Sequence, residues 1–253
     1  MKKLFYAIAI LSVAVLAVNS CKKGTPEEPT IKKRLVMCGD EWDKYHFFYN
    51  ADGSVKEVKR NLDETTGAWE RTWTFTWNGK NAAVKYVKEG EEQNPLSLTL
   101  GGNGYIETIT DTWGDVRKCT YDLEGHLLKV FKVENGQDVL KCNCVWEGGN
   151  LIKWSRFTDT GEQFKIQSFL LEKNDAGIFP DATDKAGLDR WMFEVGFFGK
   201  PSKLLMDQAA WEGAEDNATH TYTKDADNFV TKVEKFYAGE LDQTYEYKWE
   251  LLQ

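Results

Sequence analysis

The sequence predicts a mainly all-β protein: a long antiparallel meander of hairpin repeats that curls into an open shell or half-barrel, with one short helix near residues 184–196. Three observations predict this class. Aromatic residues make up 13% of the 253 residues, and 10 residues are tryptophan; aromatic side chains favour pleated sheets. Short strand-turn units recur about every 25 residues. The recurrence is interrupted once, between Leu171 and Tyr222, where the apolar residues have helical spacing instead.

The repeating unit consists of an aromatic or apolar strand end, a polar turn and a second strand. Two strands of about eight residues and two turns fill such a unit, so each unit is one hairpin. Asp-Gly and Asn-Gly pairs supply the positive φ that tight turns need. A propeller blade needs about 40 residues, so the period excludes a propeller. The strand-end anchors are Tyr49, Trp77, Leu100, Tyr121, Trp146, Leu171, Tyr222 and Tyr247.

Apolar and polar residues alternate within the predicted strands. In residues 71–77, Trp73, Phe75 and Trp77 occupy every second position and share one face of the strand, and the threonines between them lie on the other face. A sheet of about fourteen strands cannot stay flat, because strand twist accumulates from strand to strand. We therefore expect a curved shell whose concave side is filled by another segment.

The filling segment is predicted between the anchors Leu171 and Tyr222. Leu188, Trp191, Met192 and Val195 have helical spacing, with Asp184 as the N-terminal cap. The residues that follow, 196–205, are apolar and rich in helix breakers. We expect them to plug one end of the sheet.

The N-terminal residues have the features of a secretory signal peptide. Lys2 and Lys3 form a short basic region, and residues 4–18 are an uninterrupted apolar run. This run is shorter than the roughly 20 residues that a transmembrane helix needs. Residues 16–21 resemble a bacterial lipobox in its looser Bacteroidetes form, although Asn19 departs from the stricter pattern.

The lipobox resemblance implies that Cys21 is diacylated by palmitate-type chains. The outer membrane is then a partner of the protein, which it holds through this lipid anchor. The alternative is an ordinary cysteine just past a plain signal peptide. In the lipoproteins that this segment resembles, an acid-rich stretch directly after the lipidated cysteine is associated with export to the cell surface. Here Lys22 and Lys23 come first and the acidic pair at 27–28 follows later, so the periplasmic and the cell-surface face both remain open. The predicted organisation is a lipoprotein signal peptide in 1–20, the lipidated cysteine and a tether in 21–34, and a single β-repeat domain in 35–253.

Four cysteines follow the predicted anchor: Cys38, Cys119, Cys142 and Cys144. Cys142 and Cys144 lie on one face of a predicted strand, so they do not pair easily with each other. Cys119 is the expected disulfide partner of one of them, and buried thiols are the alternative. The Cys-x-Cys spacing has no histidine nearby, so we predict no metal site.

Charge and motifs exclude several function classes. The net charge is -8 and no basic patch dominates, so a nucleic-acid partner is not expected. His46, His126 and His220 belong to different repeats, and no nucleophile motif accompanies them. No phosphate loop or dinucleotide fingerprint occurs, so no cofactor is predicted. We therefore predict no catalytic residues and a protein that is not an enzyme.

The tryptophan excess is the one feature that points to binding. Trp42, Trp69, Trp113 and Trp211 lie near predicted turns, where an aromatic ring can stack on a sugar or anchor a protein partner. Packing in the core is the alternative reading for these four, and it is favoured for Trp73, which alternates with other aromatic residues within its strand.

Two families resemble parts of this pattern. Turns such as residues 121–127, of the type Tyr-Asp-x-x-Gly-x-Leu, resemble the YD repeats of secreted Rhs-type shells. The lipobox, the hairpin units, residues 196–205 and the turn after Tyr222 together resemble a family of Bacteroidetes lipoproteins described only as a domain of unknown function. Leu205 and Met206 stand where that family usually has a proline. The resemblance implies fold and address but no substrate.

Three functions remain open at this stage. The first is a membrane-anchored, non-enzymatic binding or scaffold module whose partner is a glycan or an envelope protein. The second is a periplasmic lipid-handling or structural half-barrel with an open apolar concave face. The third is a hydrolase without a recognisable motif, which requires acidic or histidine side chains to converge in one pocket.

Overall fold

The computed structural model describes residues 32–180, 188–215 and 217–252. They belong to one compact unit, residues 32–253, and residues 1–31 form a second unit. The predicted signal peptide, Cys21 and most of the tether therefore lie outside the described residues. The first strand begins at Lys33, two residues before the predicted domain boundary at 35.

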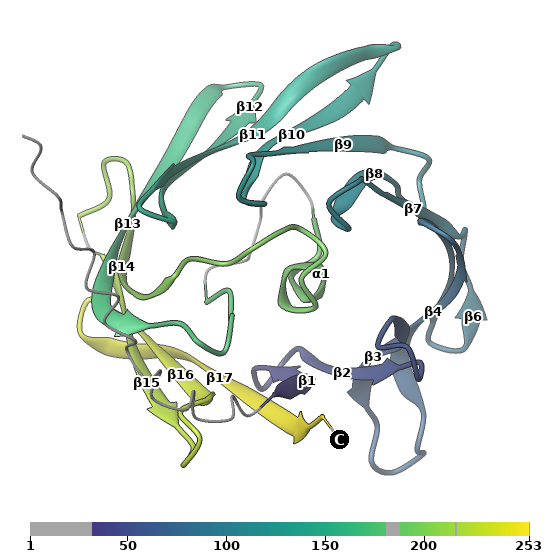
Figure 1. Ribbon diagram of the computed structural model, residues 1–253, viewed down its shortest axis with the longest axis horizontal. Helices are drawn as coiled ribbons and strands as arrows, with labels where there is room; N and C mark the ends of the chain where they lie inside the picture. The colour runs from purple at the N-terminus through teal and green to yellow at the C-terminus, as the bar shows by residue number, and fades with distance from the viewer. Residues whose placement is uncertain (1–31, 181–187, 216, 253) are drawn as a thin grey trace, which may run out of the picture. The chain divides into compact units, whose positions relative to one another are not determined.

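Seventeen strands and one helix make up the described chain (Figure 1). In chain order they are β1 (Lys33–Gly39), β2 (Lys44–Tyr49), β3 (Val55–Leu62), β4 (Trp69–Asn78), β5 (Asn81–Lys88), β6 (Glu91–Glu92), β7 (Leu96–Leu100), β8 (Ile106–Thr110), β9 (Val116–Tyr121), β10 (Leu127–Glu134), β11 (Gln137–Glu147), β12 (Asn150–Thr158), β13 (Gly161–Lys173), α1 (Arg190–Glu194), β14 (Leu204–Trp211), β15 (Ala218–Lys224), β16 (Val230–Tyr237) and β17 (Glu240–Leu251).

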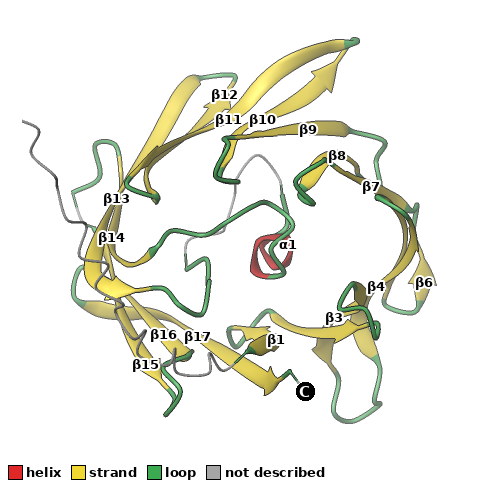
Figure 2. Cartoon of the chain, viewed as in Figure 1, coloured by secondary structure: helices red, strands yellow, loops and turns green. Residues whose placement is uncertain are grey.

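The strands form a closed antiparallel barrel. Each strand pairs with its neighbours in the chain, and β1 closes the ring because its Cys38 pairs with Tyr45 on β2 and with Tyr247 on β17. The two-residue strand β6 pairs with β5, and the other strands complete the ring (Figure 2). The all-β class and the single helix are confirmed. The open shell or half-barrel is wrong, because pairing of the first strand with the last removes both exposed edges of the sheet.

The inner face of the barrel is apolar and the outer face is polar. Val58, Val84 and Val130 point inward and are fully buried. Between them along the strands, lysine, glutamate and threonine side chains point outward. Ion pairs cross the outer surface, for example Lys85 with Glu92 at 2.7 Å. This alternation is the arrangement that the sequence pattern predicts for a sheet with one buried face.

A segment between β13 and β14 fills the barrel, and we call residues 188–203 the plug. The α1 side chain Trp191 is fully buried, with its ring centroid 5.4 Å from that of Trp73 and 5.9 Å from that of Phe75. Figure 2 shows α1 surrounded by strands. The helix is shorter than the predicted 184–196; residues 184–187, including the predicted cap Asp184, lie outside the described residues.

The plug closes one end of the barrel, which we call the plugged end. There the backbone of Gly199 forms an antiparallel bridge with His126. The amide of Lys200 donates to the carbonyl of Gly125 at 2.9 Å, and that of Lys203 donates to Gly149 at 3.0 Å. Both ends of the described chain meet at this end too, because the Leu252 amide donates to the Lys32 carbonyl at 2.9 Å. The expectation that residues 196–205 plug one end agrees with this geometry.

The period of about 25 residues has a structural cause at the plugged end. An aromatic residue at the end of every second strand donates its hydroxyl or indole hydrogen to a carbonyl at the start of the preceding strand. Two of the anchors predicted from sequence, Leu100 and Leu171, have no donor in their side chains. At the end of β17 the donor is Trp249 and not the predicted anchor Tyr247. The six pairs, at 2.6–2.8 Å, are Tyr49 with Leu35, Trp77 with Val55, Tyr121 with Ile106, Trp146 with Leu127, Tyr222 with Met206, and Trp249 with Val230.

Replacement of one anchor tests this account. Trp146→Phe keeps an aromatic ring but removes the donor for the Leu127 carbonyl, 2.8 Å away. We expect a loss of about 1 kcal/mol or more in the free energy of unfolding, because a partly buried carbonyl loses its partner and some packing volume is lost. Urea unfolding measures it. Trp42→Phe, at a ring that is 74% exposed, is the control, and equal effects of the two changes would contradict the account.

Candidate functional site

The four tryptophans predicted to face a ligand all lie at the end opposite the plug. We call this end the mouth; it is formed by the loops at 40–43, 63–68, 111–115, 159–160 and 238–239. Trp42 and Trp113 lie in two of these loops with 74% and 86% of their surface exposed. Trp69 begins β4 and Trp211 ends β14. The structure does not bring the four rings together, since each lines a different depression.

The other tryptophans have structural places. Trp77, Trp146 and Trp249 are the anchors at the plugged end. Trp73, Trp154 and Trp191 are buried in the core. For the tryptophans on strands, the position along the strand therefore decides whether the ring lies at the mouth, at the plugged end or in the core. Trp191 belongs to α1.

Trp211 lines a cavity of about 460 Å³ at the mouth, within the usual range for small-molecule sites. We call it the mouth cavity. Its wall comes from one arc of the barrel, from β12 through β17 to β2, and its floor from α1. The lining side chains are Asp40, Asp43, Tyr45, Arg156, Lys165, Arg190, Trp211, Lys235, Gln243 and Tyr245, together with Pro180.

Basic side chains in the mouth cavity lie over aromatic rings. The Arg156 guanidinium is 4.5 Å from the centroid of the Trp211 ring, and the Lys165 ammonium is 5.1 Å from it. The Arg190 guanidinium is 3.7 Å from the centroid of Tyr245. Strand register explains the first group, because Lys165 on β13 pairs directly with Trp211 on β14 and shares its face. Cation–π contacts of this kind hold the charged groups in place.

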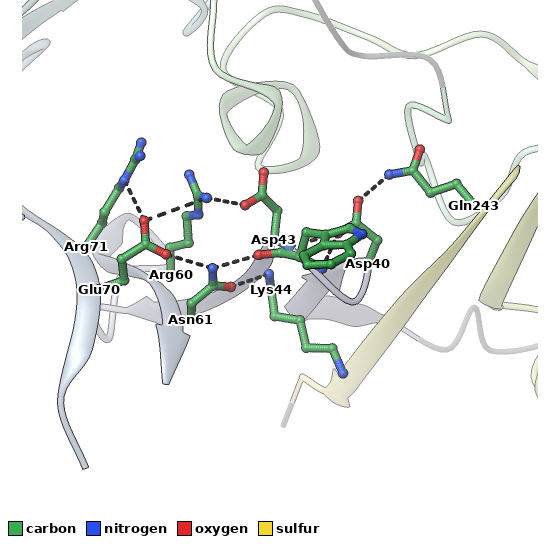
Figure 3. A network of polar contacts seen from close by, with 9 residues as sticks. Asp40, Asp43, Lys44, Arg60, Asn61, Glu70, Arg71 and Gln243 are labelled. Carbon is green, nitrogen blue, oxygen red and sulfur yellow. Dashed lines mark hydrogen bonds and ion pairs between the residues drawn. The ribbon is translucent and has the colours of Figure 1, made fainter. Parts of the chain in front are cut away.

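The acidic side of the mouth cavity is already engaged by protein donors (Figure 3). One oxygen of Asp40 accepts the Trp42 and Asp43 amides, each at 2.8 Å, and its other oxygen accepts the Gln243 side chain at 2.5 Å. The carboxylate of Asp43 contacts the Arg60 guanidinium. The donors to Asp40 are neutral, and the Arg60 contact with Asp43 supplies the positive charge in this set.

Arg60 also approaches Glu70 in the same network, at 3.7 Å. Burial alone would raise the pKa of Glu70, but the hydrogen bond from Asn61 and the charges of Arg60 and Arg71 outweigh it and lower the pKa. Glu70 is therefore ionised at neutral pH. It completes a compact network that fixes the β1–β2 loop against β3 and β4.

Carboxylates partner the basic residues Lys235 and Arg190 of the mouth cavity. Lys235 contacts Asp242 at 2.6 Å, and Arg190 contacts the buried Glu194 at 3.5 Å. Burial raises the pKa of Glu194, although Arg190 opposes the shift. Arg156 contacts a neutral side chain, donating to Gln163 at 2.8 Å. The basic side chains Arg156 and Lys165 of this cavity come from β12 and β13.

Trp113 lines a second, smaller cavity of about 120 Å³, next to an ion pair between Asp111 and Arg117 at 2.5 Å. Burial would raise the pKa of Asp111, but hydrogen bonds from Arg117 and from the amides of Asp115 and Trp113 outweigh it and lower the pKa from 3.8. The stabilisation is present above the unfolded-state pKa and is lost as pH falls through the folded-state value.

We therefore expect Asp111→Asn to lower the unfolding temperature at pH 7, with a difference from wild type that shrinks as pH falls from 7 through the lowered pKa of Asp111. Calorimetric scans across this pH range measure the difference. Asp159→Asn in the β12–β13 loop serves as a control for a mouth carboxylate. A temperature difference between wild type and Asp111→Asn that stays constant with pH would contradict the assignment.

The three histidines lie in separate surroundings. The His126 ring contacts Asp122 at 2.9 Å and stacks on Trp146 at 4.3 Å, at the plugged end, and neither partner is a nucleophile. His220 approaches the backbone carbonyl of Asp207 at 3.3 Å. His46 packs edge-on against Trp69 on the outer face. Within the described ranges, no cluster of three or more histidine, cysteine or acidic residues could hold a metal ion.

The four cysteines of the barrel are buried thiols in this structure. The sulfurs of Cys142 and Cys144 lie 3.9 Å apart. Burial raises the pKa of the Cys119 thiol to about 12, which makes it a poor nucleophile at neutral pH. The disulfide of Cys119 with Cys142 or Cys144 stays a prediction.

One apolar cavity lies between the plug and the barrel wall. The cavity between the plug and the wall near Phe198 holds about 40 Å³, room for only a few water molecules. No helix among the described residues is long and apolar enough to cross a membrane.

Solved structures share this barrel. A porin-like protein from Bacteroides uniformis matches with a TM-score of 0.66 and 18% identity over 87% of this chain and 98% of its own. A porin-like protein from Bacteroides vulgatus matches with a TM-score of 0.56 and 10% identity over 85% of this chain and 98% of its own. The likeness shows the fold. No protein-family model and no curated protein matches the chain.

Sequence reasoning found the tryptophans of the mouth but missed the basic residues beside them. Arg156 and Lys165 interrupt the apolar face of their strands close to the mouth. In β12 the pattern Trp154-x-Arg156 places a cation where the next apolar residue is expected. The signal in the sequence for these basic residues was a charged residue at a strand position whose neighbours on the same face are apolar.

Proposed function

We propose that this chain is a membrane-anchored, non-enzymatic envelope protein whose barrel binds a partner at its mouth. The observation that carries the proposal is the difference between the two ends. The described chain begins with Lys32 at the plugged end, and the predicted anchor Cys21 precedes it in the sequence. The mouth carries the cavity of about 460 Å³ and all four turn-associated tryptophans. The length of the strands separates Lys32 from the mouth cavity.

The outer wall supports attachment through a lipid rather than insertion of the strands. Membrane-spanning barrels expose an apolar band to lipid and enclose a polar interior. Here the order is reversed: Lys85, Thr221 and Lys248 point outward, whereas the interior is filled with apolar side chains. Each lysine facing the bilayer centre costs about 2–4 kcal/mol. Two solved structures with this fold are called porin-like, and this chain shares that fold.

The interior and the titratable groups support binding over the alternatives. A lipid-handling role requires open apolar space, and the plug fills that space. A hydrolase requires a nucleophile and a base in one cleft, which His46, His126 and His220 do not provide. The mouth cavity combines basic and aromatic side chains suited to recognition.

Fractionation of cells that produce the Cys21→Ala variant tests the anchor. We expect the wild type in the membrane fraction and the processed variant in the soluble fraction, with the same unfolding temperature for both barrels. Cys144→Ala, a cysteine change inside the barrel, is the matched control and leaves the protein in the membrane fraction. A processed Cys21→Ala variant that stays in the membrane fraction would overturn the proposal.

A further inference from the structure

We infer that a groove beside the mouth docks a basic, extended segment of a partner protein, with Trp42 and Trp69 as its aromatic contacts. The inference rests on the proposed function and names the class of partner that this end of the barrel receives. The groove measures about 620 Å³ and lies between the β3–β4 loop and the turn after β5. We call it the β3–β5 groove. It shares no lining residue with the mouth cavity.

Apolar side chains line much of the β3–β5 groove. They are Leu62 at the end of β3, Ala68 and Trp69 at the start of β4, and Val87 near the end of β5. Strand register brings them together, because Leu62 pairs with Trp69, and Thr72 on β4 pairs with Val87. Leu62 is a large apolar side chain, yet it is 44% exposed. Exposed apolar surface with a polar rim is typical of a binding surface.

The charged side chains that line the β3–β5 groove are all acidic. They are Asp63, Glu70 and Glu89, and the lining contains no lysine, arginine or histidine. A hydrogen bond from the Thr66 hydroxyl, with others from nearby amides, lowers the pKa of Asp63, so this carboxylate is ionised at neutral pH. Glu70 already contacts two arginines (Figure 3). Asp63 and Glu89 have no ion pair within the part of the chain that the structure describes. The groove is therefore complementary to positive charge.

Trp42 extends this surface beyond the groove. Its backbone carbonyl accepts a hydrogen bond from the side chain of Asn61, at 2.7 Å, and Asn61 is part of the groove lining. The Trp42 ring is 74% exposed, and the exposed Glu41 precedes it in the chain. The face of a tryptophan ring attracts the cation of an arginine or lysine side chain. Tryptophan and arginine are also frequent anchors of protein interfaces.

The Trp69 ring already lies near one cation of the barrel itself. The Lys59 ammonium is 5.9 Å from the centroid of this ring. Glu57 pairs with the same ammonium at 3.3 Å, so Lys59 adds no net positive charge to the surface. The contact shows that this ring is placed to accept a cation.

The extent of the surface favours a polypeptide over a small cation. Trp42 and Trp69 line separate depressions, so a ligand that contacts both rings must be elongated. An extended chain advances about 3.3 Å per residue and directs every second side chain to the same side. Nucleic acids and acidic peptides are repelled by the carboxylates. A neutral sugar can stack on the rings but leaves the carboxylates without a counter-charge.

Fluorescence anisotropy of labelled peptides tests the inference with the whole processed chain, used as the Cys21→Ala variant. The basic probe alternates arginine with alanine, and two peptides of the same length carry serine or glutamate in place of arginine. At about 150 mM salt, charges that are more than about 8 Å apart are largely screened, so the overall charge of the chain contributes little. We expect the arginine peptide to bind more tightly than the other two by about tenfold or more.

Variants place the binding at the β3–β5 groove. Trp42→Ala removes one ring and Glu89→Lys reverses one charge, and each is expected to weaken binding of the arginine peptide about threefold or more. Trp113→Ala and Glu212→Lys are the matched controls, because both side chains are exposed at the same end of the barrel but do not line the groove. Each control is expected to change the affinity less than about 1.5-fold. Unfolding temperatures verify that all four variants are folded.

Several outcomes overturn the inference. They are no binding of the arginine peptide, equal binding of the serine peptide, and equal effects of a groove variant and its matched control. Binding of cellohexaose in place of the arginine peptide overturns it too and indicates a glycan surface. These results leave the proposed anchor standing, because the Cys21→Ala fractionation tests it independently of the partner. A failed fractionation, in turn, removes the proposed function whatever the peptides show.

Discussion

Trp191→Ala is expected to destabilise the barrel by about 3–5 kcal/mol, a large part of the total stability of a typical domain. Trp191 is fully buried, and its ring contacts Trp73, Phe75 and Phe197 with centroids 5.4–6.3 Å away. Truncation leaves a cavity that a closed ring of strands cannot collapse to fill, because the wall is hydrogen-bonded all round. Urea or guanidinium unfolding measures the loss.

Trp113→Ala is the matched control for this change. Its ring is 86% exposed, so removing it is expected to change the free energy of unfolding by less than about 0.5 kcal/mol. Similar losses for the two variants would show that Trp191 is not central to the core. They would also contradict the plugged interior.

Gly199→Ala is expected to cost about 2–5 kcal/mol through the backbone. Gly199 has φ +93°, and an added Cβ would lie 2.4 Å from the Gly125 carbonyl oxygen. That oxygen accepts the Lys200 amide that ties the plug to the β9–β10 turn. The substitution combines left-handed strain with a clash against backbone, so the plug must move away from the wall. Thermal unfolding and proteolysis of the plug measure the result.

Gly196→Ala separates the two causes. Gly196 lies in the same plug with φ +77°, but an added Cβ there meets no atom within 4 Å. Only the left-handed strain of about 1–2 kcal/mol remains. If both variants lose the same stability, the close approach of Gly199 to the β9–β10 turn does not hold the plug.

Local physics made much of the barrel predictable from sequence. Alternation in residues such as 71–77 gave the inward face, and Gly-containing turns gave the hairpins. Closure was missed because it depends on a pairing between β1 and β17 more than 200 residues apart in the chain, as for Cys38 with Tyr247. Assigning residues 33 and 34 to a tether also hid the start of the closing strand.

The candidate site was predictable only in part. The turn positions of Trp42, Trp69, Trp113 and Trp211 are local features, and antiparallel strands bring them all to one end. The mouth cavity instead depends on which strands become neighbours in the ring, so the presence of Arg156 and Asp40 around one cavity could not be read from spacing. The period itself had a cause that composition does not show: the bonds from anchors such as Trp146 to backbone carbonyls.

Cysteine labelling tests whether the outer wall of the plugged barrel faces water, as the proposed lipid tether requires. The barrel cysteines are buried, so Lys85→Cys on β5 and Thr221→Cys on β15 report on two parts of the outer wall. The test uses opened envelopes without detergent, a membrane-impermeant maleimide, and the exposed turn position Leu123→Cys as reference. We predict that both wall positions react as fast as Leu123→Cys. Protection of both until detergent is added would contradict the account.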